Sequence, residues 1–155
     1  MGTIEKAIEI AAKAHAGVTD NEGEPYILHS IRVMMGVNGE AARIVAVLHD
    51  VVEDTEVTMD DIKSEGFSDG VIAALSLVTH APDQPYADYV IACKENDIAR
   101  QVKLSDLRDN SSLARMLLRP ERIQRDMARM RKYLLSYRFL IDEISEADYR
   151  NLMAD

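Results

Sequence analysis

A histidine and three carboxylates share one short segment, His49-Asp50-Val51-Val52-Glu53-Asp54. The segment follows the apolar run 44–48, which predicts a buried helix, so the acids are expected at or near the C-terminal end of that helix. The helix dipole disfavours negative charge there, and Asp50 and Asp54 repel each other at i,i+4. No Lys or Arg lies between residues 43 and 63. The acids therefore need a cation from elsewhere, and imidazole and carboxylate groups suit a divalent transition metal.

The spacing within this segment separates two pairs of side chains. His49 and Asp50 are adjacent, so on a helix they point about 100° apart and reach one ion only if it lies over the helix edge. Glu53 is one turn beyond His49, and Asp54 is one turn beyond Asp50, so both would lie near the metal as groups that hold or activate water. A solvated helix end is the alternative, and the absence of basic residues argues against it.

Two further segments bear on a metal site. Residues 23–29 end in His29, which on its own predicts only a capping or packing histidine at a helix start. In the segment 102–110, Asp106 shares a helical stripe with Lys103 at i−3 and with Asn110 at i+4. On an otherwise apolar helix this stripe predicts a polar pocket, and a surface salt bridge between Lys103 and Asp106 is the alternative.

A basic stripe follows near the C-terminal end. Arg125, Arg129, Lys132 and Tyr133 share one helical face, at spacings of i+4, i+7 and i+8. A solvated face that balances an acidic chain is the simpler interpretation, because the net charge is −9. That charge repels nucleic acid on average, and the stripe has no aromatic residues before Tyr133, so a nucleic-acid-binding module is the least favoured reading.

The composition is that of a soluble globular protein, with 47% hydrophobic and 29% charged residues among 155, enough for one domain with a core. The single cysteine, Cys93, cannot form an internal disulfide, which favours a reducing compartment. Charges within residues 1–17 break any signal-peptide core, and no apolar stretch approaches the length of a membrane span. We therefore expect a cytoplasmic protein without membrane association, and the length and composition leave its oligomeric state open.

Nearly every segment has helical rather than alternating periodicity, so the predicted fold is all-α. No repeat or Pro/Gly-rich linker interrupts the chain, which indicates one compact helical domain over residues 1–155. The expected elements are a helix ending at Gly17, a loop at 18–25, a helix through 29–37, a helix after Gly39 that carries the acidic turn, a helix from a capping box at Thr58 toward Gly66, a helix capped by Ser68 through Thr79, a loop at 81–85, helices at 86–95, 97–115 and 120–142, and a last helix capped by Ser145.

Taken together, the three polar segments resemble the HD-domain metal-dependent phosphohydrolases. The closest fit is to the RelA/SpoT-type alarmone hydrolases, including the small stand-alone ones. The motifs that carry this resemblance are residues 23–29 (GEPYILH), 48–55 (LHDVVEDT) and 102–106 (VKLSD) with Asn110. The resemblance extends from about His15 to Tyr133, which is most of the chain.

The resemblance implies a role for each matching position. It implies hydrolysis of the 3′-pyrophosphate of ppGpp or pppGpp, with one Mn²⁺ as the cofactor and a small-molecule nucleotide as the substrate. The implied metal ligands are His29, His49, Asp50 and Asp106, and the residues that activate or position the attacking water are Glu53 and Asp54. The implied or expected substrate-binding residues are Lys103, Asn110, Arg129, Lys132 and Tyr133.

One departure concerns substrate recognition. The family usually places an Arg-Lys pair in the loop before its GEPY segment, whereas this chain has Asp20 and Asn21, followed by Glu22. These acids would face an anionic substrate with the wrong sign, and Arg129 and Lys132 could compensate. Restoring an Arg-Lys pair is expected to lower KM for ppGpp.

Two alternatives therefore stay open. The first is a phosphohydrolase that acts on another nucleotide or phosphate ester. The second is a metal- or nucleotide-binding module without turnover, against which the intact Glu53-Asp54 pair argues, because a binding module has no need of a group that activates water.

Overall fold

The computed structural model describes residues 1–155, and its regular secondary structure consists of helices alone. The all-α prediction is confirmed. The helices are α1 (Ile4–Ala14), α2 (Ile27–Met35), α3 (Glu40–Leu48), α4 (Val51–Asp54), α5 (Met59–Ser64), α6 (Asp69–Val78), α7 (Tyr86–Lys94), α8 (Asp97–Asn110), the 3-10 helix η1 (Pro120–Arg122), α9 (Ile123–Leu140) and α10 (Glu146–Ala154). None of these helices combines the length and the hydrophobicity needed to span a membrane.

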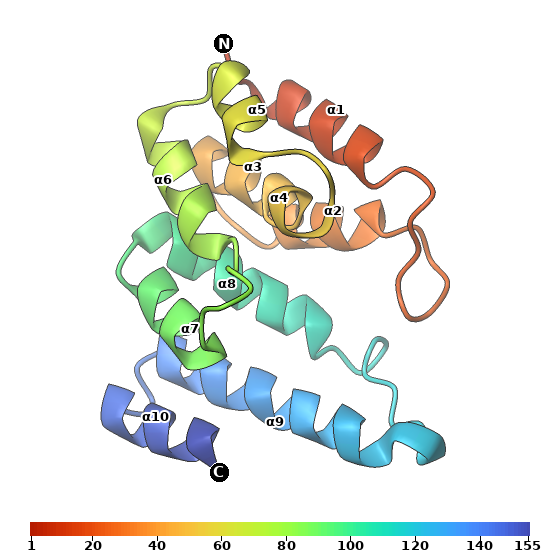
Figure 1. Cartoon of the computed structure of the whole chain (residues 1–155), viewed down its shortest axis with the longest axis vertical. Coiled ribbons are helices and arrows are strands. Elements are labelled where there is room, and N and C mark those ends of the chain that lie inside the picture. The colour runs from red at the N-terminus through yellow and green to blue at the C-terminus, as the bar shows by residue number, and fades with distance from the viewer.

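The N-terminus and the C-terminus lie at opposite ends of the molecule, and the helices pack between them (Figure 1). Helices α1 to α6 form one half of the molecule around α3, and α7, α9 and α10 form the other half, with α8 between them. The bridge between Thr19 and Pro25 closes the loop that joins α1 to α2.

Local sequence signals set most of the helix starts. Thr58 and Asp61 form the expected capping box at α5, in which each side chain bonds to the backbone N–H of the other residue. The hydroxyls of Ser68 and Ser145 accept hydrogen bonds from backbone N–H groups in the first turns of α6 and α10. The predicted caps are therefore confirmed.

Helix α3 is the centre of the core. Val45, Ala46, Val47 and Leu48 are fully buried, and α3 contacts α1, α2, α6 and α8. Such burial on every side explains why this segment is apolar without an alternating polar face. It also places the C-terminal end of α3, where the acidic turn begins, in the middle of the molecule.

The prediction that one continuous helix carries the acidic turn is wrong. Helix α3 ends at Leu48, and the separate short helix α4 begins at Val51. The carbonyl of Ala46 accepts hydrogen bonds from both the backbone N–H and the ring Nδ1 of His49, which interrupts the regular helical ladder. His49 and Asp50 therefore lie at the junction between the end of α3 and the start of α4.

The predicted helix over 97–115 is also too long. Helix α8 ends at Asn110, where the Ser111 hydroxyl and backbone N–H both donate to the carbonyl of Leu107. Serine competes for backbone acceptors in this way and therefore favours helix ends. Residues 111–119 form a loop, and the segment predicted as 120–142 divides into η1 and α9.

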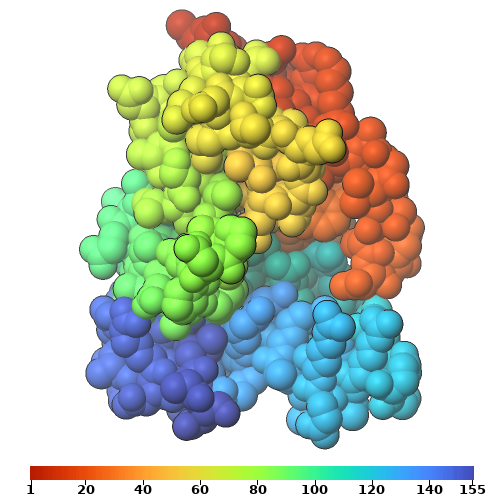
Figure 2. Space-filling model, viewed as in Figure 1, coloured from red at the N-terminus to blue at the C-terminus, as the bar shows by residue number.

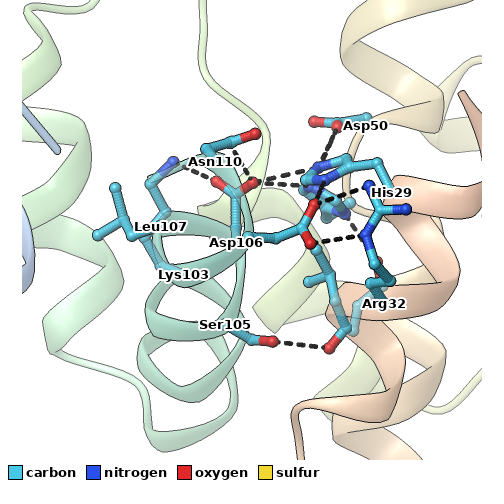
Figure 3. A network of polar contacts seen from close by, with 12 residues as sticks. His29, Arg32, Asp50, Lys103, Ser105, Asp106, Leu107 and Asn110 are labelled. Atoms are coloured by element: carbon cyan, nitrogen blue, oxygen red, sulfur yellow. Dashed lines mark hydrogen bonds and ion pairs between the residues drawn. The ribbon is translucent and has the colours of Figure 1, made fainter. Parts of the chain in front are cut away.

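Helices α2 and α8 are in close contact, which brings two of the polar segments together. The Ser105 hydroxyl of α8 donates to the carbonyl of Val33 in α2 at 2.8 Å (Figure 3). A Cβ at Gly36 would collide with the same hydroxyl, so a larger residue at this position would displace it from Val33. This contact sets His29 of α2 opposite Asp106 of α8.

Candidate metal centre

Four potential ligand atoms from three segments converge on one point. His29 comes from α2, His49 and Asp50 from the break between α3 and α4, and Asp106 from α8. His29 Nε2 lies 3.5 Å from Asp50 Oδ2 and 3.3 Å from Asp106 Oδ1. His49 Nε2 lies 3.0 Å and 3.5 Å from the same two oxygens. The ligand set expected from the sequence is thus brought together within bonding reach of a single ion.

Both imidazoles present Nε2 to this point because Nδ1 is engaged elsewhere. His49 Nδ1 donates to the carbonyl of Ala46 at 2.7 Å. His29 Nδ1 donates to Asp109 Oδ2 at 2.6 Å. A hydrogen bond of this kind fixes the tautomer and the ring orientation of a metal-ligating histidine. The Nε2 atoms therefore face the two carboxylates.

The charges at this point attract a cation. His49 Nε2 is buried and has no hydrogen-bond partner. Burial by itself would lower the pKa of both imidazoles, but the neighbouring aspartates more than offset it: Asp106, Asp109 and Asp50 raise the pKa of His29 to about 9, and Asp50 and Asp106 raise that of His49. The atoms of His29, His49 and Asp50 form a donor set that suits a divalent transition-metal ion, and Asp106 Oδ1 adds a second carboxylate oxygen close to both imidazoles. The residues present therefore fit a divalent metal.

Further hydrogen bonds hold the two carboxylates in place (Figure 3). Asp106 accepts from Lys103 Nζ at 2.8 Å and from Asn110 Nδ2 at 2.8 Å. Asp50 accepts from the hydroxyl of Tyr26, whose pKa is raised by burial and by the charge of Asp50, so this phenol stays a donor. The other two members of the stripe predicted on α8, Lys103 and Asn110, thus hold the ligand Asp106 in place.

Lys103 is not part of a surface salt bridge. Its side chain is only 8% exposed, as is that of Asp106. Burial would lower the pKa of Lys103, but the contact with Asp106 holds it well above its usual range, so the lysine remains charged. The surface interpretation of this pair is therefore wrong.

A cavity of about 370 Å³ opens beside the four ligand atoms. Glu53 and Asp54 of α4 reach its wall, and the backbone N–H of His80 donates to Glu53 Oε2 at 3.1 Å. Burial within the cavity and the charge of Asp50 raise the pKa of both acids, that of Asp54 to about 6. The residues that line the cavity are Tyr26, Asp50, Glu53, Asp54, His80, Tyr86, Tyr89, Lys103, Asp106, Asn110, Lys132 and Tyr133.

The raised pKa of Asp54 predicts how the metal-free protein responds to pH. Because the folded state binds this proton more tightly, ionisation of Asp54 costs folding free energy, and the cost develops as the pH rises from about 4 to about 6. In EDTA at pH 7.5, the variant Asp54→Asn should therefore melt at a higher temperature than the native protein. The difference should vanish near pH 4. A variant no more stable than the native protein at pH 7.5 would contradict this prediction.

Known proteins with related sequences are longer than this chain. A guanosine-3′,5′-bis(diphosphate) 3′-pyrophosphohydrolase from Aquifex aeolicus is 32% identical over 120 residues, which cover 69% of this chain and 17% of that protein. The protein of the same name from Borreliella burgdorferi is 38% identical over 85 residues, covering 52% of this chain and 13% of that protein. A GTP pyrophosphokinase from Streptomyces coelicolor is 28% identical over 130 residues, covering 75% of this chain and 15% of that protein. The chain thus spans less than a fifth of these relatives, and no protein-family model matches it.

A solved structure has the same fold over almost its whole length. It is described as "A metazoan ortholog of SpoT hydrolyzes ppGpp and plays a role in starvation responses". The superposition has a TM-score of 0.69 with 20% sequence identity and covers 99% of this chain and 95% of that one. The sequence relatives and the shared fold point to the same family as the three motifs that carry the donor atoms. The chain belongs to the RelA/SpoT-type HD domains.

The basic stripe of this HD domain divides between two environments. Lys132 and Tyr133 line the cavity, and Lys132 Nζ lies 4.4 Å above the ring of Tyr86. Arg129 does not line it, and its guanidinium instead lies 3.4 Å from the buried Asp126. The structure therefore brings Lys132 and Tyr133 to the site and leaves Arg129 outside its wall.

Sequence reasoning missed several residues around the HD motif. Tyr86 and Tyr89 line the cavity from α7, where no motif marks them. Tyr26 lies in the same sequence segment as His29, but its contact with Asp50 depends on the fold. Asp109 and Arg115 stand behind His29, and their part in the site depends on contacts distant in sequence.

Proposed function

We propose that this HD domain is a metal-dependent hydrolase of the 3′-pyrophosphate group of ppGpp or pppGpp. The observation that carries the proposal is the donor set of His29, His49, Asp50 and Asp106 beside a cavity that two lysines also line. The names of the sequence relatives from Aquifex aeolicus and Borreliella burgdorferi support the substrate. Residues 1–155 act in this proposal as a single domain.

In this proposal His29, His49, Asp50 and Asp106 hold one Mn²⁺. Manganese accepts mixed nitrogen and oxygen ligands, and four protein ligands leave positions open on a six-coordinate ion. When bound, the ion lowers the pKa of a coordinated water and withdraws electron density from a phosphoryl oxygen. Asp106 remains ionised for this role, because Lys103 and the histidines hold its pKa well below the usual range against the effect of burial.

Glu53 takes the proton that the attacking water loses, and Asp54 beside it is the second group that activates or positions this water. Their carboxylates lie on the cavity wall one helical turn beyond the ligands. A pKa near the working pH allows a carboxylate to accept a proton and then release it, and the pKa of Asp54 is about 6. Glu53 is held in its orientation by the N–H of His80.

Lys103 and Lys132 supply the positive charge for the substrate's phosphates. Lys103 is fixed by Asp106, whereas Lys132 has no carboxylate partner among the ion pairs of the structure and is free to pair with a ligand. Burial and the nearby charge of Lys103 lower the pKa of Lys132. Asn110 and Tyr133 offer an amide and a phenol ring for the nucleoside.

The split of the basic stripe predicts unequal effects of two substitutions. Lys132→Ala should raise KM for ppGpp about tenfold or more, because it removes a charge-assisted bond to phosphate. Arg129→Ala should raise KM much less, since Asp126 holds this arginine outside the cavity wall. Steady-state kinetics of the two variants will check this, and equal effects on KM would contradict the division of the stripe.

Metal binding should also be visible without any substrate. Mn²⁺ should raise the melting temperature of EDTA-treated protein, because a ligand that binds only the folded state stabilises it by mass action. The variant His49→Ala, which lacks one ligand, should show no such rise. A native protein whose melting temperature is unchanged by Mn²⁺ would contradict the proposed metal site.

The experiment that tests the substrate is an activity screen with Mn²⁺ across ppGpp, other nucleotides and simple phosphate esters. The proposal predicts that ppGpp is cleaved with the highest kcat/KM. A specific observation favours one alternative, a different phosphorylated nucleotide, because no arginine or lysine occupies positions 20 and 21. Preferred cleavage of such a nucleotide would keep the hydrolase and replace the substrate.

A further inference from the structure

The loop after α8 returns Arg115 to the back of the metal site. The Arg115 side chain is 13% exposed, and its Nη1 donates to Asp109 Oδ2 at 2.5 Å and to Asn110 Oδ1 at 3.3 Å. Helix α8 ends at Asn110, so this contact depends on the helix stopping before residue 111. The guanidinium thus sits beside the carboxylate that orients His29.

The acidic loop between α1 and α2 surrounds the other side of this guanidinium. Asp20 Oδ2 lies 3.6 Å from Arg115 Nη2, and Glu22 Oε1 lies 3.8 Å from Arg115 Nε. In Figure 2 the two loops meet at the right-hand side of the molecule, the first in orange and the second in cyan. Neither acid lines the cavity.

The Asp20 side chain is buried and hydrogen-bonded within its own loop, so it does not face a substrate. Its side chain is only 3% exposed. Asp20 Oδ1 accepts the backbone N–H groups of Glu22 at 2.9 Å and Glu24 at 3.0 Å, so the residue folds its own loop while Oδ2 faces Arg115. A buried carboxylate without a cation is costly, and Arg115 supplies that cation.

Asp109 links this cluster to a metal ligand. Its Oδ2 accepts from both Arg115 Nη1 and His29 Nδ1, and its Oδ1 accepts from Arg32 Nε at 2.7 Å. Two arginines from different elements therefore fix the carboxylate that fixes the imidazole. Partners of this kind behind a ligand typically change metal affinity by about 10–100-fold when they are removed.

We propose that Arg115 is a positioning residue for His29, held in place by Asp20 and Glu22. The acids of the loop keep the guanidinium against Asp109, and Asp109 keeps the Nε2 atom of His29 aimed at the ion. The inference rests on the proposed function only in that His29 binds a divalent metal. It gives the acidic loop a role in forming the site, where the family's basic pair would have contacted the nucleotide.

This role reverses one expectation from the sequence. An Arg-Lys pair at positions 20 and 21 would place positive charge against Arg115 and remove a buried partner. Asp20→Arg with Asn21→Lys should therefore weaken Mn²⁺ binding rather than lower KM for ppGpp.

The test measures Mn²⁺ affinity by calorimetric titration of metal-free protein, with no nucleotide present. Arg115→Gln should weaken binding about 10–100-fold, and Arg115→Lys should weaken it less, because it keeps the charge. Asp20→Asn with Glu22→Gln should give a loss between these two. Adding those two changes to Arg115→Gln should cause no further loss, because all three act through one contact. The matched control is Arg150→Gln, an exposed arginine bonded to Asp88 and Glu146, which should bind Mn²⁺ like the native protein.

Native Mn²⁺ affinity in Arg115→Gln would overturn the inference, even if its melting temperature falls, because a purely structural role changes stability alone. A native protein that binds no Mn²⁺ would overturn it as well. Should Arg115→Gln fail to fold, Arg115→Lys and the double variant decide by the same criterion. If the native protein does not cleave ppGpp but Arg115→Gln still weakens Mn²⁺ binding, the proposed function fails and this inference stands.

Discussion

Replacing Asp106 by alanine should abolish Mn²⁺ binding and lower the unfolding free energy of the metal-free protein by about 3–5 kcal/mol. The carboxylate serves two purposes, since Oδ1 faces the histidines and Oδ2 holds Lys103. Without it the ammonium of Lys103 is left buried with no opposite charge. Urea denaturation in EDTA measures the loss of stability, and calorimetric titration measures the loss of metal.

The control removes both members of the ion pair. In the double variant Lys103→Met with Asp106→Asn no buried charge is left, so most of the stability should return while Mn²⁺ binding stays absent. A loss below about 1 kcal/mol in Asp106→Ala, the range of exposed pairs, would show that solvent relieves Lys103 and would contradict the burial argument.

The second large effect is expected from Glu53→Gln. The amide keeps the shape of the side chain and can still accept the N–H of His80, but it cannot take a proton. The kcat for ppGpp should fall by about 10²–10⁴-fold, the usual contribution of a general base, with Mn²⁺ affinity close to native.

His49→Ala is the reference for metal loss in this experiment. If Glu53→Gln loses Mn²⁺ as readily as His49→Ala, then Glu53 is a ligand, and its assignment as the proton acceptor is wrong. Single-turnover kinetics at saturating Mn²⁺ separate the two cases, because a pure loss of metal is reversed by added ion.

Most of the fold follows from local signals. Ser68, Ser145 and the Thr58–Asp61 box mark their helix starts because a capping side chain bonds to a backbone group only a few residues away. The convergence of the donor atoms could be predicted for a related reason. Each ligand lies in a short segment with a distinctive pattern, and packing of α2, α3 and α8 brings the segments together.

The remaining features depend on contacts that no local pattern records. The sequence predicts a polar pocket around Lys103 but leaves a surface ion pair open, and it is the packing of α7 and α9 against α8 that buries this lysine. Arg129 and Lys132 share one predicted stripe, yet Arg129 pairs with Asp126 while Lys132 lines the cavity. The break after α3 arises because a side chain, that of His49, competes for a backbone acceptor.

The measurement that tests the central claim most directly is ³¹P NMR of ppGpp that has been incubated with the protein and Mn²⁺ and from which the paramagnetic ion has then been removed. We expect the 3′-pyrophosphate signals to disappear while free pyrophosphate and GDP accumulate in equal amounts, and we expect EDTA present during the incubation, or the His49→Ala substitution, to stop the conversion. Unchanged ppGpp in the presence of Mn²⁺-loaded protein, or release of orthophosphate in place of pyrophosphate, would contradict it.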